Sequence, residues 1–222
     1  MMRAYKFLTA EFGLKSLRER RLKQSRIHEL NDPFELRPYD VTDTALRQAV
    51  LKTRDDLDND GRGLVCFSAD RCDPVIWAHY SDKHKGLCLG FEIPEMKEDD
   101  VTDAFGRVYY IEKPLSFPSN FEELSESEGL AIMRKFLLTK FAHWAYENEI
   151  RVWVLLQNEE DGHHYLEFDE KLRLVEVVIG ARCTLSRTEI TNALGSLESE
   201  VKIIRARAAY DGFRMVEDER GP

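Results

Sequence analysis

Short stretches in which apolar and polar residues alternate predict β-strands with one buried face. The clearest is residues 87–93, where Leu87, Leu89 and Phe91 alternate with smaller or polar residues. A period of two along the chain is typical of a strand. Gly90 inside it would let a ligand or another backbone come close, because it has no side chain. Further short apolar stretches predict strands at residues 4–8, 63–68, 106–111, 150–156, 174–180 and 201–208.

A short helix is predicted between the strands at 63–68 and 87–93. Asp73 followed by proline is typical of an N-cap and the first helical position. On this helix Trp77 and Tyr80 are three residues apart, so they share a face. Large aromatic side chains with polar groups therefore gather on one side of the helix.

Apolar residues that recur every three or four positions predict helices at 10–23, 42–52 and 187–197. The longest is expected from about residue 129 to residue 144. Its apolar positions, which we assign to the core, are Leu130, Met133, Leu137, Phe141 and Trp144.

Turn residues predict where these elements are interrupted. The sequence Asn-Asp-Pro at 31–33 predicts a turn, because proline fixes its own backbone and restricts the residue before it. We expect Phe34 to anchor that turn in the core. Exposed loops are expected at 54–63 and at the acidic stretch 94–103.

A second polar group lies where the predicted long helix meets the next strand. If that strand begins near Glu147, then Glu147, Glu149 and Arg151 project from one face while Ile150 projects from the other. Two carboxylates about 7 Å apart, with an arginine beside them, follow from the strand period. This arrangement is compatible with a catalytic site and equally with a structural salt bridge.

Composition supports one globular domain in the cytoplasm. The chain of 222 residues is 43% hydrophobic and 10% aromatic, enough for a single well-buried core. We predict one α+β domain over residues 1–216, with an antiparallel split sheet and flanking helices, and a flexible tail at 217–222. Neither an apolar stretch long enough for a membrane span nor a signal peptide is found. The four cysteines are predicted to be free thiols.

Charge and motifs narrow the chemistry only slightly. A net charge of -9 opposes broad, non-specific binding to nucleic acids, which depends on many lysine and arginine contacts to phosphates. The sequence has no GxGxxG, P-loop or HExxH motif, which removes the commonest nucleotide and zinc signatures.

Five motifs give the chain a resemblance to a widespread bacterial family of domains of unknown function. That family resemblance implies no reaction. A weaker, fold-level resemblance is to ADP-ribosyltransferases, in the order of the elements, a serine at a strand end and a glutamate at a strand start. The five motifs are YKF at 5–7, NDPFE at 31–35, CFS at 66–68, WAHYSDKHKG at 77–86 and YENEIR at 146–151.

The second resemblance implies a reaction on NAD. Release of nicotinamide develops positive charge on the ribose, which a carboxylate stabilises in the transition state. Glu149 is the implied catalyst, Glu147 positions the acceptor and His79 carries a proton. Tyr80 is implied to stack on the nicotinamide. The other implied contacts to NAD are Tyr5, Lys6, Ser68, Trp77, His84 and Arg151.

The same resemblance implies partners and a context. The acceptor would be a protein or a nucleic acid, and the setting a bacterial toxin or an antiphage effector with a neutralising partner. No membrane partner and no metal are expected for this reaction.

Two alternatives from other functional classes stay open. In a metal-dependent nuclease, Asp32, Glu35, Glu147 and Glu149 would gather Mg²⁺ through oxygen ligands. In a non-catalytic module, an aromatic pocket would bind a nucleotide or a peptide. The side chains of that pocket would be Trp77, Tyr80 and Trp144.

Overall fold

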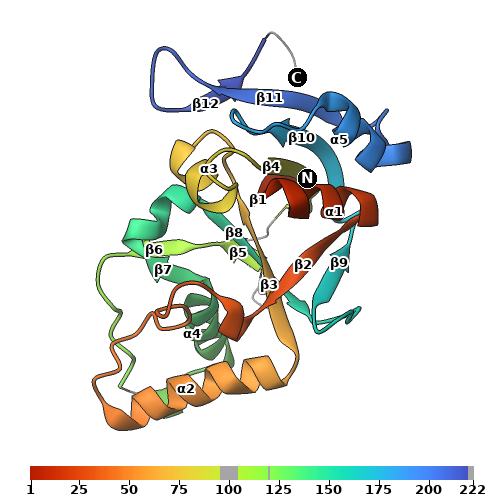
Figure 1. The fold of residues 1–222 in the computed structure, drawn as a ribbon. Coiled ribbons are helices and arrows are strands. Elements are labelled where there is room, and N and C mark those ends of the chain that lie inside the picture. Colours follow the sequence, from red (N-terminus) through yellow and green to blue (C-terminus); the bar gives the residue numbers. More distant parts are fainter. Residues whose placement is uncertain (96–104, 120, 220–222) are drawn as a thin grey trace. The chain divides into compact units, whose positions relative to one another are not determined.

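The structure is a computed structural model that describes residues 1–95, 105–119 and 121–219 (Figure 1). Its contacts divide the chain into two compact units, each built from segments that are separated in the sequence. Unit 1 comprises Met1–Leu22, Phe67–Glu95 and Leu166–Pro222, and unit 2 comprises Lys23–Cys66 and Met96–Tyr165. The chain mixes helices with mostly antiparallel strands, which confirms the predicted α+β class at that level.

The strands of unit 1 are arranged around β4. This strand pairs antiparallel with β1 on one edge and with β10 on the other. Strand β10 continues parallel to β11, and β12 closes that edge as an antiparallel hairpin with β11. Strand bounds in this unit are β1 Met2–Leu8, β4 Leu87–Ile93, β10 Arg173–Ile179, β11 Lys202–Ala208 and β12 Met215–Glu217.

Strand β4 differs from its prediction in one respect, because both of its faces are buried. Cys88 is as fully buried as Leu87 and Leu89. A strand in the middle of a sheet is covered on both faces, and small residues such as Cys88 and Gly90 suit the second face. A Cβ atom added at Gly90 would lie 3.1 Å from the Glu176 side chain and 3.2 Å from the Tyr5 ring. The predicted close approach at Gly90 is therefore made by the protein's own side chains.

The helices of unit 1 begin at the residues that the sequence marks as caps. Asp73 accepts a hydrogen bond from the backbone of Val75 at the start of α3. Helix α1 is shorter than predicted because Arg20 adopts a left-handed backbone (φ 54°) and ends it. The following residues form β2. The helices of unit 1 are α1 Ala10–Glu19, α3 Pro74–Tyr80 and α5 Arg187–Leu194, followed by the 3-10 turn η4 Gly195–Leu197. Strand β2, Arg21–Arg26, begins in unit 1 and continues into unit 2.

The turn between α3 and β4 has an unusual backbone. Asp82, Lys83 and His84 are consecutive and all left-handed, with φ of 41°, 56° and 68°. The turn closes at Gly86, where an added Cβ would lie 2.0 Å from the carbonyl oxygen of Leu8. Glycine is therefore required at this position by the close approach of two backbones.

Unit 2 has a core between helices α2 and α4. Its buried members are Ile27, Leu36, Tyr39, Val50, Phe136, Leu137 and Leu138. Strand β8 pairs with β3 and β5, while β6 and β7 form a separate parallel pair. The bounds are α2 Thr44–Asn59, α4 Glu126–Leu138, β3 Arg62–Ser68, β5 Phe105–Arg107, β6 Tyr109–Ile111, β7 Thr139–Phe141, β8 Glu149–Leu155 and β9 His164–Glu167, with 3-10 turns η1 Ile27–Glu29, η2 Phe121–Glu123 and η3 Ala142–Glu147.

Two helix predictions in unit 2 were wrong in length. The predicted helix at 129–144 ends at Leu138, because the next three residues pair with β6 as a strand. Its predicted core positions Leu130 and Met133 are exposed, and Phe136 and Leu138 are buried instead. Helix α2 continues to Asn59 through most of the predicted loop at 54–63.

Several other expectations have a plain outcome. All four cysteines are free, as predicted. Within the described ranges, no helix is long and apolar enough to cross a membrane. Most of the predicted acidic loop at 94–103 lies outside the described residues. Strand β12 includes Glu217, the first residue of the predicted tail, and the single-domain boundary at 216 stays a prediction.

Candidate functional site

The predicted pairing at the start of β8 is present and buried. Arg151 donates from Nε to Oε1 of Glu149 at 2.8 Å and from Nη2 to Oε2 at 3.0 Å. Arg151 is fully buried and Glu149 is 3% exposed. The two side chains share one face of the strand, as their spacing predicts. Arg151 Nη1 also donates to the carbonyl oxygen of Leu137 at 3.0 Å.

Glu147 reaches the same place by a different route from the predicted one. It lies in η3 and not on the strand, and Asn148 separates it from β8 with a left-handed backbone (φ 43°). Lys140 joins the two carboxylates, since its Nζ lies 2.6 Å from Glu147 Oε2 and 3.4 Å from Glu149 Oε2. The ammonium also lies 4.8 Å from the ring centroid of Trp144.

Glu35 completes the group from the NDPFE motif. Its carboxylate lies 3.1 Å from Lys140 Nζ and 3.0 Å from Arg151 Nη2. We call these five buried residues of unit 2 the ion cluster. Three carboxyl groups therefore face two cationic groups, and with all five ionised the cluster carries one excess negative charge. Its members are Glu35, Lys140, Glu147, Glu149 and Arg151.

Three members of the cluster, Lys140, Glu149 and Arg151, are held in their charged forms. Burial alone raises the pKa of Glu149, but the charge and hydrogen bonds of Arg151, with Lys140 nearby, outweigh burial and lower that pKa to about 2. The carboxylates likewise raise the pKa of Lys140 and of Arg151 against the effect of burial. Burial raises the pKa of Tyr110, whose hydroxyl accepts a hydrogen bond from the Glu149 backbone at 2.9 Å.

The turn that supplies Glu35 points its neighbours in opposite directions. Asp32 accepts a hydrogen bond from the Phe34 backbone at 2.8 Å, which fixes the start of the turn. Leu36 is fully buried with a left-handed backbone (φ 58°), so it turns inward with Glu35. Phe34 is 64% exposed, and its prediction as a core residue was wrong. Glu35 takes the inward position instead, where it pairs with Lys140 and Arg151.

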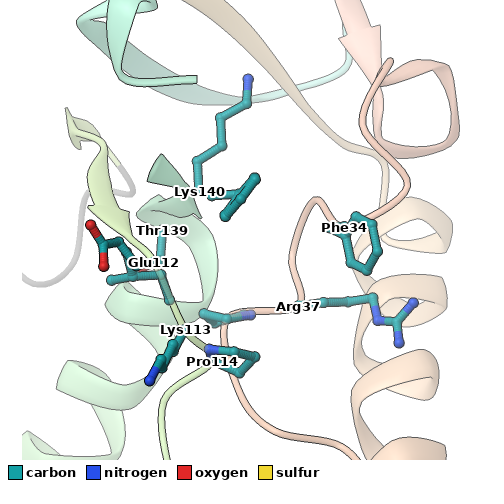
Figure 2. Close-up of a pocket in the computed structure, with 10 residues that line it drawn as sticks. Phe34, Arg37, Glu112, Lys113, Pro114, Thr139 and Lys140 are labelled. Carbon is teal, nitrogen blue, oxygen red and sulfur yellow. The ribbon is translucent and has the colours of Figure 1, made fainter. Parts of the chain in front are cut away.

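A pocket of about 240 Å³ lies beside this turn, within unit 2. Figure 2 shows Phe34 and Arg37 on one side and Pro114 and Lys113 on the other. Lys140 also lines the pocket, but its ammonium points away from Arg37 and Pro114. The aliphatic part of Lys140 therefore belongs to the pocket and its charge to the ion cluster.

Among the predicted binding residues of unit 1, Trp77 is part of the core. It is fully buried, its ring meets Phe7 edge to face at a centroid distance of 5.1 Å, and its Nε1 donates to the Arg71 carbonyl at 2.7 Å. Trp77 therefore presents no exposed face to a ligand in this structure. His84 stacks on it at 6.3 Å, and burial lowers the pKa of His84.

The remaining residues of unit 1 that were predicted to bind NAD have different partners and different exposure. The Ser68 hydroxyl is used within its own turn, donating to the carbonyl of Asp70 at 2.8 Å. Tyr5 is hydrogen-bonded to Arg71, which pairs with Glu176 at 3.2 Å. His79 is exposed and meets the ring of Tyr80 at 6.4 Å. The last of these residues, Lys6, is partly buried on β1.

The carboxylates of the nuclease alternative are engaged elsewhere. Glu35, Glu147 and Glu149 face Lys140 and Arg151, and Asp32 caps its turn. Across the described part of the chain, no three His, Cys, Asp or Glu side chains are grouped to hold a metal ion. The geometry is that of an ion-pair network.

Sequence reasoning missed Lys140 and Arg37. Lys140 was placed inside the predicted long helix, where a lysine is typical of a solvated face. Its role depends on the chain leaving the helix at Thr139, and nothing in the helical period marks that change. Arg37 follows a motif that was interpreted as a turn, so its place at a pocket had no local signal.

Comparison with known proteins adds a family for part of the chain. No curated protein and no solved structure matches it. A family model described as "Protein of unknown function (DUF2971)" matches residues 76–152. Two of the five motifs, WAHYSDKHKG and YENEIR, lie within those residues, and the other three lie outside them. Residues 76–152, which carry four of the five members of the ion cluster, thus match the family described as protein of unknown function (DUF2971).

Proposed function

We propose that the chain is an enzyme of the ADP-ribosyltransferase kind that acts on NAD, with the ion cluster as its charge centre. One observation carries this proposal: Glu149 stands at the start of a strand and is held as a carboxylate, with a pKa of about 2. Cleavage of nicotinamide from NAD leaves positive charge on the ribose. A preorganised carboxylate in a cluster with excess negative charge would stabilise that charge in the transition state.

The burial of the cluster sets a condition on this chemistry. Glu149 and Glu147 are 3% and 5% exposed, so a ribose must displace some of what covers them. The contact between Lys140 and Glu149, at 3.4 Å, is the longest ion pair of the cluster. Catalysis would thus begin when Glu149 exchanges this contact for the substrate, while Arg151 keeps the carboxylate oriented.

The proposal includes the predicted roles in unit 1 and the wider context. By the resemblance, Tyr80 would stack on the nicotinamide and His79 would carry a proton, whereas Trp77 is enclosed in the core of unit 1. The fold would be the split antiparallel sheet of ADP-ribosyltransferases. The acceptor would be a protein or a nucleic acid in the cytoplasm, and a toxin or antiphage effector would need a neutralising partner.

The proposal is tested by incubating the purified chain with NAD and measuring released nicotinamide by chromatography. We expect slow release that Glu147→Gln and Glu149→Gln reduce by more than tenfold. Exposed Glu159, in the same unit, gives the matched control Glu159→Gln, which should keep full release. Circular dichroism and a thermal midpoint for each variant separate loss of chemistry from loss of fold. No binding of the unmodified chain to millimolar NAD would refute the proposal.

A further inference from the structure

The pocket beside the NDPFE turn has walls suited to a planar apolar molecule. Its lining includes the apolar side chains of Phe34, Pro38, Ile111, Pro114 and Phe141. Its volume of about 240 Å³ is below the roughly 300–1,000 Å³ of sites for drug-sized ligands. A ligand of one or two rings is therefore the size that this pocket takes.

Arg37 gives the pocket its charge. The residue is partly buried, and its guanidinium carbon lies 5.7 Å from the ring centroid of Phe34. No carboxylate of residues 1–95, 105–119 or 121–219 forms an ion pair with it. Lys113 follows Glu112 in the sequence, and both residues line the pocket, while the ammonium of Lys140 is engaged in the ion cluster. Arg37 is the cation that we assign to a ligand, because it is the one that lies beside the Phe34 ring.

The turn that carries Phe34 and Arg37 is fixed by the buried contacts of the two residues between them, Glu35 and Leu36. Glu35 is anchored by Lys140 and Arg151, and Leu36 is buried in the core of unit 2. The left-handed backbone of Leu36 (φ 58°) is strained for a residue other than glycine, and such strain persists only where the surroundings impose it. The two side chains are therefore presented in a fixed arrangement, which lowers the cost of ordering them on binding.

We propose that this pocket binds a small planar acid, an aromatic molecule of one or two rings with a single carboxylate. The ring packs between Phe34 and Pro114, and the carboxylate pairs with Arg37. A planar guanidinium matches a carboxylate with two parallel hydrogen bonds. This site adjoins the ion cluster through the aliphatic part of Lys140, but the two residues that would hold the ligand, Phe34 and Arg37, do not belong to the cluster.

The test compares two probes of nearly the same shape, the anion naphthalene-1-acetate and its neutral amide, naphthalene-1-acetamide. Binding to the full chain is measured by calorimetry in the absence of NAD. We expect naphthalene-1-acetate to bind at submillimolar concentration and the amide to bind on the order of tenfold more weakly, because hydrogen bonds between two charged groups are stronger than those to a neutral group.

Three variants connect these affinities to the site. Arg37→Gln should remove the preference for the acid, and Phe34→Ala should weaken both probes. Lys135→Gln, on the exposed surface of α4, is the control and should change neither affinity. Equal affinity for acid and amide, no binding of either at millimolar concentration, or an unchanged preference in Arg37→Gln would each overturn the proposal. Because NAD is absent, none of these results bears on ADP-ribosyl transfer.

Discussion

Replacing Glu149 by glutamine removes one charge from the ion cluster and keeps the shape of the side chain. Arg151 then remains fully buried with Glu35 and the Leu137 carbonyl as neighbours. The substitution removes one of the two carboxylates paired with Arg151, and breaking a buried ion pair costs a protein roughly 3–5 kcal/mol. The substitution should therefore lower the free energy of unfolding strongly at neutral pH.

The pKa of Glu149 gives an independent magnitude. It falls from its ordinary value of 4.5 to about 2 in the folded chain. A shift of this size corresponds to about 3 kcal/mol of stability at pH 7. The two routes agree, so we expect Glu149→Gln to cost about 3 kcal/mol at that pH.

The dependence on pH distinguishes charge from packing. Because the folded pKa is lower than the unfolded one, the carboxylate stabilises the fold above the unfolded value and this stabilisation is lost as the pH falls toward 2. The difference between the unmodified chain and Glu149→Gln should therefore narrow by about 2 kcal/mol between pH 7 and pH 3.

Urea unfolding followed by tryptophan fluorescence at both pH values measures these differences. Glu159→Gln, which changes an exposed carboxylate of the same unit, should stay within about 0.5 kcal/mol of the unmodified chain. A cost below 1 kcal/mol at pH 7 for Glu149→Gln, or a cost that is equal at pH 3, would refute the electrostatic account of the cluster.

Four other substitutions test packing, each by the shift of the urea midpoint. Trp77→Ala should cost about 3–5 kcal/mol because the ring is fully buried; a small cost would contradict its place in the core. Phe34→Ala should lower the free energy of unfolding by less than about 0.5 kcal/mol, because the side chain is mostly exposed. A large decrease would indicate that Phe34 packs in the core after all. Gly86→Ala should destabilise the fold strongly, because the added Cβ would clash with the Leu8 carbonyl oxygen. Gly129→Ala, at a helical position of α4 with open space around it, should instead raise the free energy of unfolding by about 0.5–1 kcal/mol. Equal effects of the two glycine changes would be inconsistent with this geometry.

Local chemistry made part of the fold readable from the sequence. Asp73 and the proline after it specify the start of α3 by themselves, because a cap needs only neighbouring residues. The alternation of apolar with small or polar residues around Leu89 likewise predicts β4, because it also depends only on residues that are close in the sequence. The shared face of Glu149 and Arg151 follows from the strand period alone.

The rest depends on partners that are distant in the sequence. The helix ends at Leu138 because the next residues pair with β6, and the helical period continues through that point without a break. Glu35 and Arg151 are 116 residues apart, so their contact has no local signal. Phe34 was assigned to the core on hydrophobicity, yet the buried place beside it is filled by Glu35, whose cost of burial is offset by two cations.

The position of β4 between β1 and β10 has a consequence for synthesis on the ribosome. Strands β1 and β4 emerge early, but β10 follows only after the second segment of unit 2 has been made. At about 5–20 residues per second, one apolar edge of β4 waits on the order of ten seconds for its partner. A nascent chain that stops at Tyr165 keeps that edge open, and open strand edges recruit other chains. The C-terminal strands thus protect the first sheet from aggregation only once they have been made, and the unfinished chain depends on other means until then.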